Sequence, residues 1–290
     1  MTRTALVTAG TGGIGLHTAL GLAQAGHTVT IVGRNPERGT HAADTITSQT
    51  GEKARYLQAD LSSLDQVRDL ARQIATEGPL DVLVNNVGAM FPDHTHLDGV
   101  EASFVVNHLS PYLLTELLLP VLTTRIVNVT SGSIAFAKKN FDTLEPRGGY
   151  YGFHWYGRAK LANLTYTLDL AERLRDTGIG VLAADPGGAD TDMTDGSSRT
   201  PKIVSPPLRL LWPLVRRALE RGTSGPASLA ARPSIRAATD PTLPTGTVLG
   251  PDTQPVTPHK TATNPRTIAA VRALTETHAP LHRVPDGLSN

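Results

Sequence analysis

The chain has 290 residues, of which 39% are hydrophobic and 18% charged, a composition typical of a globular protein with a sizeable core. Its net charge of +1 provides no broad field for nucleic acid or for an acidic membrane surface, so neither is expected as a partner. The absence of cysteine excludes disulfides, thiol catalysis and cysteine-bound metal, and no apolar run is long enough to predict a membrane anchor.

The chain opens with the pattern of a dinucleotide-binding βαβ unit. A strand is predicted over 4–8, a helix ending near Ala25 and a second strand over 28–33, with the turn Ala9-Gly10-Thr11-Gly12-Gly13-Ile14-Gly15 after the first strand. Glycines let a pyrophosphate approach the backbone, and the helix N-terminus presents free N–H groups to it. Because the first strand follows the initial residues directly, no secretory signal is expected and a cytoplasmic protein is predicted.

The end of the second strand bears on cofactor choice. NAD-preferring folds carry an acidic residue here to bind the ribose hydroxyls, whereas this chain has Gly33 and then Arg34. A guanidinium suits a 2′-phosphate, so the sequence favours NADP(H). The alternative is an ordinary surface arginine.

Strands and helices continue to alternate through residue 184. Further strands are predicted over 54–57, 80–84, 125–129 and 180–184, and helices over 36–49, from Ser62 to about 76 with Asp65 in a capping-box variant, over 100–118, and from the Tyr156 region to about 177. Six short apolar strands separated by helices predict a Rossmann-type, doubly wound parallel α/β sheet. Gly10, Asn86, Ser131 and Pro186 each follow a strand, so they should gather at the edge where such sheets bind ligands.

Tyr156 and Lys160 are four residues apart on a predicted helix and therefore project from one face. A fixed ammonium beside a phenol favours the phenolate, so Lys160 is expected to lower the pKa of Tyr156 while staying charged. The pair would then donate and accept protons near neutral pH. A tyrosine and a lysine on a solvated helix face are the alternative, because this spacing alone is common.

Proline use divides the chain, with 6 of the 21 prolines in residues 1–185 and 15 in 186–290. We predict a single domain over 1–290, in which 1–192 form the cofactor-binding and catalytic core and 193–290 a loop-rich substrate lid and C-terminal extension. Within the lid, 195–207 should be mobile and the apolar run 208–215 should close over a bulky hydrophobic substrate. Packing on the core and a shallow membrane contact are the alternatives for that run.

Other polar groups receive structural interpretations. His94 and His96 lack a nearby third ligand, so two solvated histidines are expected rather than a metal site. Trp155 should pack, while His154 is equally compatible with packing and with the substrate pocket. The arginines at 216, 217 and 221 predict a solvated basic face. No G-x-S-x-G motif supports a hydrolase.

Taken together, the ordered motifs resemble the short-chain dehydrogenase/reductase family. The resemblance rests on the glycine-rich turn, Asp60-Leu61, Asn85-Asn86-x-Gly88, Asn107 with Ser131 and Tyr156-x-x-x-Lys160, and Pro186-Gly187. It covers residues 4 to about 192 closely and the remainder loosely. Arg34-Asn35, the long gap between Ser131 and Tyr156, and the segment 238–246 are similar to the retinol-dehydrogenase-like branch, near which the bacterial ketoreductases of aromatic polyketide pathways lie.

The resemblance implies a role for each matching residue. Tyr156 would exchange the proton, Ser131 would hydrogen-bond the substrate carbonyl, Lys160 would bind the nicotinamide ribose, and Asn107 would hold a water beside Lys160. The residues implied to contact NADP(H) are Gly10, Thr11, Gly13, Ile14, Gly15, Arg34, Asp60, Leu61, Asn86, Gly88, Tyr156, Lys160, Ala189 and Thr191. The implied activity is interconversion of a ketone and a secondary alcohol on a bulky hydrophobic, polyketide-type substrate of secondary metabolism.

Two departures from the family pattern bear on cofactor affinity. Ala9 replaces the first glycine of the turn, and Val87 replaces the usual alanine. Two other functions stay open: an epimerase or isomerase with no net redox change, and a catalytically silent NADP(H)-binding regulator, against which the full set of catalytic residues argues. The sequence also leaves a homo-oligomer open.

Overall fold

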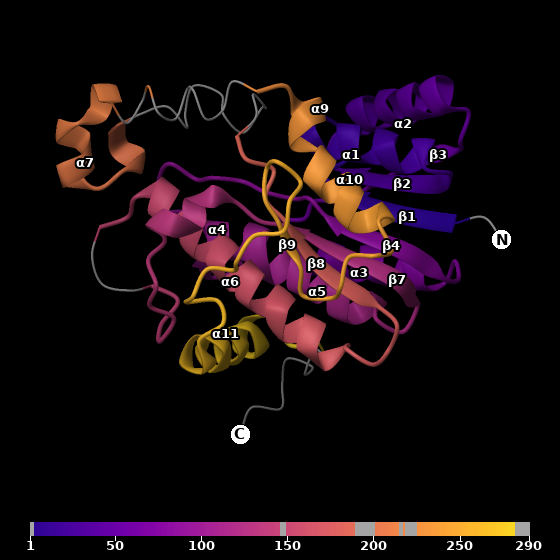
Figure 1. The fold of residues 1–290 in the computed structure, drawn as a ribbon. Coiled ribbons are helices and arrows are strands. Elements are labelled where there is room, and N and C mark those ends of the chain that lie inside the picture. The colour runs from indigo at the N-terminus through magenta and orange to yellow at the C-terminus, as the bar shows by residue number, and fades with distance from the viewer. Residues whose placement is uncertain (1–2, 146–148, 189–200, 215–216, 218–224, 282–290) are drawn as a thin grey trace.

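The computed structural model describes residues 3–145, 149–188, 201–214, 217 and 225–281. Within them, seven strands form one parallel sheet in the order β3-β2-β1-β4-β7-β8-β9 (Figure 1). The order reverses direction between β1 and β4, which is the Rossmann-type arrangement expected from the sequence. The strands are β1 (Arg3–Thr8), β2 (His27–Gly33), β3 (Ala54–Gln58), β4 (Leu80–Asn85), β7 (Leu122–Val129), β8 (Gly180–Ala184) and β9 (Val248–Leu249).

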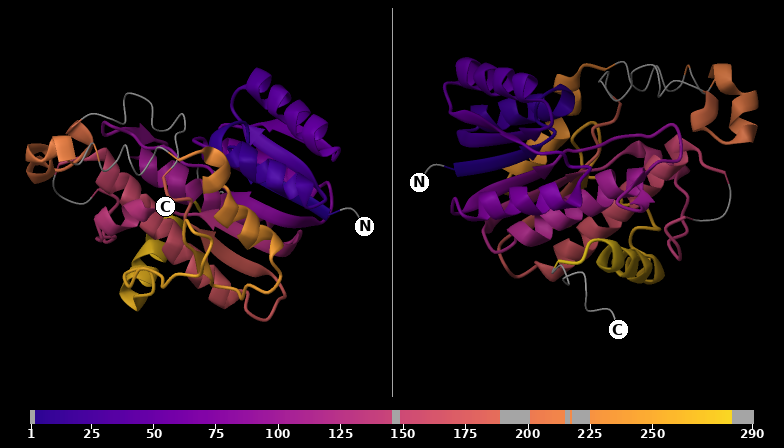
Figure 2. Two further views of the ribbon diagram at one scale, coloured as in Figure 1. Left: turned by 45° about the horizontal axis from the view of Figure 1, so that its top comes forward. Right: turned by 180° about the vertical axis from the view of Figure 1, so that it is seen from behind.

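Helices cover both faces of the sheet, as Figures 1 and 2 show. One face carries α1 (Gly13–Gln24), α2 (Pro36–Thr50), α9 (Ala227–Ala230) and α10 (Arg232–Thr239), and the other carries α3 (Leu64–Ala75), α5 (Ser110–Leu118) and α6 (Gly152–Arg173). Successive strand residues alternate between the two cores, so Leu83 belongs to the α5–α6 core and Val84 to the α1–α10 core. Helix α11 (Pro265–His278) packs outside α6, and α7 (Pro206–Leu210) lies at the periphery.

Two local predictions are wrong, and one strand was not predicted. The segment predicted as one helix over 100–118 begins as strand β6 (Val100–Glu101), paired antiparallel with β5 (His96–Leu97), and continues through α4 (Ala102–Phe104) and a π-helical turn (Val105–Leu109) before α5. The N-cap of α3 is Ser63 instead of Ser62, because the Ser62 hydroxyl donates to Asp60. Strand β9, which pairs with β8 from a distant proline-rich segment, was missed.

Candidate active site

The glycine-rich turn joins β1 to α1 at the carboxyl edge of the sheet. Ala9 adopts a left-handed φ of 50°, so the alanine occupies a conformation that glycine would tolerate better. A side chain at Gly15 is excluded, since its Cβ would lie 2.2 Å from the Ala9 carbonyl oxygen and 2.6 Å from Asn86 Nδ2. Helix α1 has no side-chain cap and no acidic residue in its first turn, which leaves its N-terminus suited to an anion.

Thr8 and Asn86 hold this turn against the end of β4. The buried Thr8 hydroxyl accepts hydrogen bonds from Asn86 N at 2.9 Å and Val87 N at 3.0 Å. The Asn86 amide in turn donates to the Thr8 carbonyl at 3.1 Å. Asn86 is therefore at the predicted edge, where its side chain fastens the turn.

Tyr156 and Ser131 come together where β7 ends and α6 begins. Tyr156 is 7% exposed, and the Ser131 side chain lies near enough to lower the pKa of its phenol. The extended Ser131 caps a short 3₁₀ helix (Gly132–Phe136) by accepting from Ser133 N at 3.2 Å. The two hydroxyl groups are thus positioned by separate elements of the core.

Lys160 and Asn107 occupy the adjoining part of the same edge. Lys160 Nζ donates to the carbonyls of Val129 at 2.9 Å and Val87 at 3.3 Å, and so touches the ends of both neighbouring strands. Asn107 lies in the π-helical turn, accepts from Ala89 N at 3.1 Å and donates to Ala89 O at 2.8 Å. A Cβ built on Gly88 would lie 3.4 Å from Asn107 Oδ1 and 3.6 Å from Lys160 Nζ, so these two groups flank one glycine.

The protonation equilibria differ from the sequence prediction. Burial raises the pKa of Tyr156 to about 12, whereas the nearby Ser131 side chain lowers it. Burial also lowers the pKa of Lys160 to about 8. The Lys160 ammonium lies 5.9 Å from the centre of the Tyr156 ring and is directed to two backbone carbonyls. Desolvation is therefore the largest influence on the pKa of the phenol.

Asp185 is an acidic member of the site that the sequence analysis did not single out. It follows β8, is half-buried, and accepts a hydrogen bond from Gly187 N at 2.9 Å, and the nearby backbone N–H of Gly132 also lowers the pKa of its carboxyl group. Burial raises the pKa of its carboxyl group, whereas Lys160 lowers it. Asp185 in turn raises the pKa of both Tyr156 and Lys160. An ionisable group directly after a strand, beside the strand end that carries Ser131, is the signal that could have identified it.

The remaining predicted cofactor residues lie along the β1–β3 side of the site or outside the described chain. Arg34 is exposed at the end of β2, directly after Gly33. Asp60 accepts from Ser62 N at 3.0 Å, and the neighbouring Leu61 is buried. Ala189 and Thr191 lie outside the described residues.

Arg38 is a basic residue on this side that the sequence analysis missed. A Cβ on Gly12 would lie 2.9 Å from Arg38 Nη2, so this guanidinium reaches the glycine-rich turn from the first turn of α2. Its side chain therefore adds a second positive charge beside the one expected at Arg34.

Helix α6 also carries the aromatic residues that precede Tyr156. Trp155 is 2% exposed, which confirms that it packs. His154 bonds the Phe136 carbonyl through Nδ1 at 2.7 Å and accepts from Ser205 N at 3.4 Å through Nε2. His154 thus joins α6 to the segment that precedes α7. Of the basic cluster predicted at 216, 217 and 221, Arg217 is described and exposed, and the other two lie outside the described residues.

The segment expected to be mobile over 195–207 is described from Pro201 onward. There, Ile203 and Val204 are each 1% exposed, so this part packs on the body instead of being a purely polar loop. The following apolar run behaves differently, since Leu210, Leu211 and Leu214 are 87%, 54% and 66% exposed.

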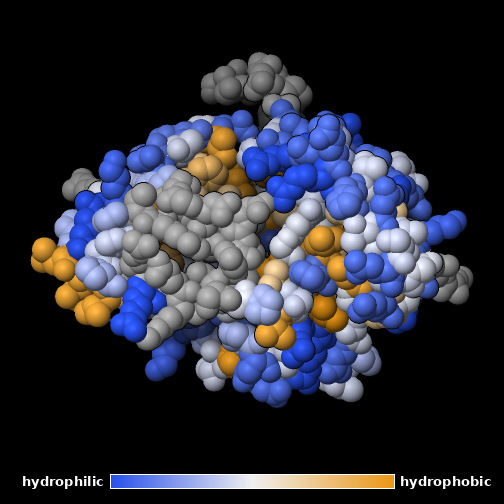
Figure 3. Space-filling model, turned by 90° about the horizontal axis from the view of Figure 1, so that it is seen from above, coloured by the Kyte–Doolittle hydropathy of each residue, from blue (hydrophilic) through white to orange (hydrophobic). Residues whose placement is uncertain are grey.

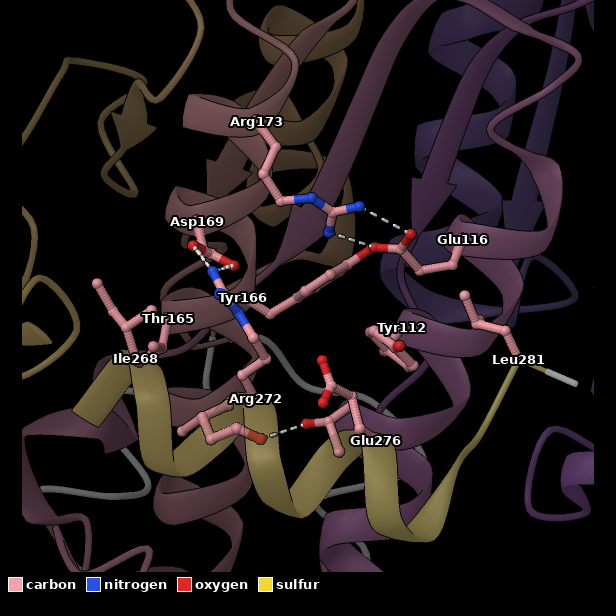
Figure 4. A pocket seen from close by; sticks show the side chains of 12 residues that line it. Tyr112, Glu116, Thr165, Tyr166, Asp169, Arg173, Ile268, Arg272, Glu276 and Leu281 are labelled. Atoms are coloured by element: carbon pink, nitrogen blue, oxygen red, sulfur yellow. Dashed lines mark hydrogen bonds and ion pairs between the residues drawn. The ribbon is translucent and has the colours of Figure 1, made fainter. Parts of the chain in front are cut away.

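A cavity of about 340 Å³ lies away from these residues, between α5, α6 and α11 (Figure 4). Its walls carry opposite charges that pair with one another: Arg173 donates to both Glu116 oxygens at 2.7 and 3.0 Å, and Arg272 bonds Asp169 at 2.8 Å. The first pair joins α6 to α5, and the second joins α11 to α6. None of the residues described at the carboxyl edge of the sheet lines this cavity, so it is separate from the candidate active site.

The chain can now be compared with known proteins. Residues 3–202 match the family model for short chain dehydrogenase. The chain is 37% identical over 199 residues to mouse retinol dehydrogenase 12, covering 66% of this chain and 63% of that protein's length. It is 35% identical over 247 residues to human retinol dehydrogenase 13, covering 80% of this chain and 70% of that protein. For some of these relatives, therefore, the match spans less than two thirds of their own length.

Solved structures give the same fold. A protein from Mycobacterium paratuberculosis superposes with a TM-score of 0.75 at 31% identity, covering 96% of this chain and 93% of that chain. A short chain dehydrogenase from Burkholderia cenocepacia, solved in complex with NADP, has a TM-score of 0.68 at 26% identity and covers 87% of this chain and 97% of its own. Among the described residues, no helix has both the length and the apolar character needed to span a bilayer. The sheet, the ordered motifs along its carboxyl edge and the match over most of the chain establish that this protein belongs to the short-chain dehydrogenase/reductase family of oxidoreductases, in its retinol-dehydrogenase-like branch.

Proposed function

We propose that the protein is an NADP(H)-dependent oxidoreductase that interconverts a ketone and a secondary alcohol, with Tyr156 as the general acid and base. The observation that carries the proposal is the convergence of Tyr156, Ser131, Lys160 and Asn107 at one sheet edge from three separate elements: α6, the end of β7 and the π-helical turn. Nearby relatives named retinol dehydrogenase, and the NADP complex of the Burkholderia structure, support the reaction class and the cofactor.

The glycine-rich turn and the uncapped N-terminus of α1 fit the pyrophosphate of a dinucleotide. Lys160 would hold the nicotinamide ribose, and Arg34 with Arg38 would face the adenosine end, where a 2′-phosphate needs positive charge. When bound, the nicotinamide supplies the hydride for reduction or accepts it in oxidation.

The chain's own residues handle the proton. In reduction, the Tyr156 hydroxyl would give its proton to the oxygen of the carbonyl as negative charge develops there, while Ser131 donates a hydrogen bond to the same oxygen. In oxidation, Tyr156 would receive the proton of the alcohol. A pKa of about 12 keeps the hydroxyl protonated at neutral pH, which is the form that donates a proton in reduction.

The substrate proposal rests on the segment around α7. Figure 3 shows an apolar group at the left edge of the molecule, over α7, where Leu210, Leu211 and Leu214 are exposed. His154 bonds Ser205 just before this helix, so the segment is fastened to α6 two residues from Tyr156. We propose that the apolar group covers a bulky hydrophobic ketone or alcohol and excludes water from the reaction.

The test is the loss of NADPH absorbance with a panel of carbonyl compounds that ranges from small polar aldehydes to polycyclic ketones. We expect turnover with bulky apolar ketones, a loss of turnover in Tyr156→Phe with NADPH binding retained, and a loss of both in Lys160→Ala. If NADPH binds but no carbonyl compound consumes it, while a substrate is epimerised or isomerised, the non-redox function is correct. If NADPH binds and no reaction of either kind occurs, the protein is a regulator.

A further inference from the structure

Two histidines and a glutamate from different loops meet on the surface beside α6. Among the residues that the structure describes, His94, His96 and Glu145 form a group of three whose candidate ligand atoms all lie within 4.8 Å of one another. His94 Nε2 is 3.6 Å from Glu145 Oε1, and His96 Nε2 is hydrogen-bonded to the same oxygen. His94 and His96 were not expected to bind metal because no third ligand lies near them in the sequence. The folded chain supplies Glu145, which is 49 residues beyond His96.

Both histidines are held in place, His96 by a strand pair and His94 by aromatic contacts. His96 lies in β5 and pairs with Glu101 in β6, whose buried carboxylate accepts from Ser103 N at 2.8 Å and Phe104 N at 2.9 Å. The ring of His94 stacks on Tyr150 with centroids 5.1 Å apart and leans on Trp155 at 5.7 Å. Since Trp155 is buried, the orientation of the His94 ring is set by the core of the protein.

The backbone that presents Glu145 is held by Arg158, which lies between Tyr156 and Lys160 on α6. Arg158 is 1% exposed and donates to the carbonyls of Asn140 at 3.0 Å, Thr143 at 2.6 Å and Leu144 at 3.0 Å. Burial lowers the pKa of this guanidinium to about 10, which leaves it charged at neutral pH. The residue directly before Glu145 is thus fixed by a charged hydrogen bond from the catalytic helix.

The geometry points to a divalent transition-metal site, of the Zn²⁺ class, formed by His94, His96 and Glu145. Two imidazoles and one carboxylate are a set that Zn²⁺ accepts, with further positions left to water or another ligand. Ligand atoms about 2.0–2.1 Å from a tetrahedral ion lie about 3.3 Å apart, close to the 3.6 Å that separates His94 Nε2 from Glu145 Oε1. Rotation of the carboxylate away from His96, together with rotation of the two imidazoles toward each other from within 4.8 Å, would complete the arrangement.

The bound ion would link two connections of the chain. One connection leaves the carboxyl end of β4 and carries both histidines, and the other leaves the end of β7 and carries Glu145. Ser131 begins the second connection, and the residues that follow β4 include Asn86 and Gly88. Joining the two would reduce the freedom of the chain on either side of the proposed active site, and would stabilise the folded state by mass action.

The competing interpretation is a hydrogen-bonded His96–Glu145 pair with His94 stacked beside it and no affinity for metal. Both interpretations predict contact between the same side chains, so substitution effects on stability in metal-free buffer do not separate them. Direct binding of the metal does, because only the metal-site interpretation predicts saturable binding that depends on Glu145 and His96.

The experiment is calorimetric titration of ZnCl₂ into the full-length protein, free of affinity tags and treated with chelator. We expect one Zn²⁺ per chain and a Tm that rises with Zn²⁺ concentration. Glu145→Gln and His96→Gln should each weaken binding by roughly tenfold or more, since even a residue that only supports a ligand is worth about that much. His41→Gln, on the exposed face of α2, is the matched control and should bind like the unmodified protein.

All variants should bind NADPH alike, which shows that each is folded. No heat and no change in Tm with Zn²⁺ in the unmodified protein would overturn the proposal. Binding that is equally strong in Glu145→Gln and His41→Gln would overturn it as well, because the ion would then be held elsewhere. Neither result depends on finding the substrate, so the metal-site proposal and the proposed reaction can be refuted separately.

Discussion

Replacing Asp185 with asparagine tests whether its charge sets the protonation of Tyr156 and Lys160. An amide has nearly the same shape, and its oxygen can still accept the hydrogen bond from Gly187 N. Its NH2 group replaces the oxygen nearer Gly132, so the negative charge and one acceptor are lost. Because Asp185 raises the pKa of both Lys160 and Tyr156, both pKa values should fall in Asp185→Asn.

The size of the change can be estimated from the position of Asp185. A neighbouring charge shifts a pKa by about 1–3 units, and Asp185 is half-buried, so solvent screening favours the lower end. One unit corresponds to about 1.4 kcal/mol. The pKa of Lys160, now about 8, should therefore fall to about 7 in the variant.

The assay is the dissociation constant of NADPH measured against pH by fluorescence, which needs no substrate. Charged Lys160 should bind the ribose better than neutral Lys160, so affinity is highest below the pKa of Lys160 and declines as pH rises through it. In the unmodified protein the decline should be centred near pH 8, and in Asp185→Asn about one unit lower.

The exposed Asp176, beyond the far end of α6, provides the control, and Asp176→Asn should leave the midpoint unchanged. A midpoint that stays near pH 8 in Asp185→Asn, with NADPH still bound, would refute the reasoning. The carboxyl group would then be protonated or fully screened in the folded protein, and its contribution would be limited to the hydrogen bonds.

Four other predictions concern separate parts of the molecule. Tyr156→Phe should lower turnover by roughly 10²–10⁴-fold with little change in NADPH affinity, and near-normal single-turnover rates would assign the proton to another group. Arg34→Asp should reduce the preference for NADPH over NADH by roughly tenfold to a hundredfold, and equal binding of both cofactors by the unmodified protein would contradict the assignment. Ala9→Gly should raise the free energy of unfolding by about 0.5–1 kcal/mol in urea melts, because relief of the left-handed φ exceeds the added chain entropy, and a loss of stability would show that the turn is not strained. Leu210→Ser with Leu214→Ser should raise KM for bulky apolar ketones more than for small ones, whereas equal effects on both would exclude α7 from the substrate cover.

Local sequence patterns were sufficient for most of the architecture. The glycine-rich turn, the apolar strands and the Tyr156–Lys160 spacing depend on interactions between residues close in the chain, and these features appear where they were predicted. The prediction of one helix over 100–118 was wrong at its start, where Val100 and Glu101 form a strand. Apolar periodicity does not reveal this strand, because it forms only when Glu101 lies opposite His96. Strand β9 was not predicted for a related reason, since two residues in a proline-rich segment become a strand only by pairing with β8.

The sequence by itself determined the family, the order of the elements and the identity of the groups at the carboxyl edge, because these follow from residue type and local spacing. The tertiary structure decided everything that depends on burial and on neighbours distant in sequence. Burial, which spacing does not record, raises the pKa of Tyr156 where the sequence predicted a decrease. Folding likewise brings Asp185 to Tyr156 and Lys160, and Glu145 to the two histidines. Both acids are visible in the sequence, but their partners are chosen by how the strand ends and their connections pack.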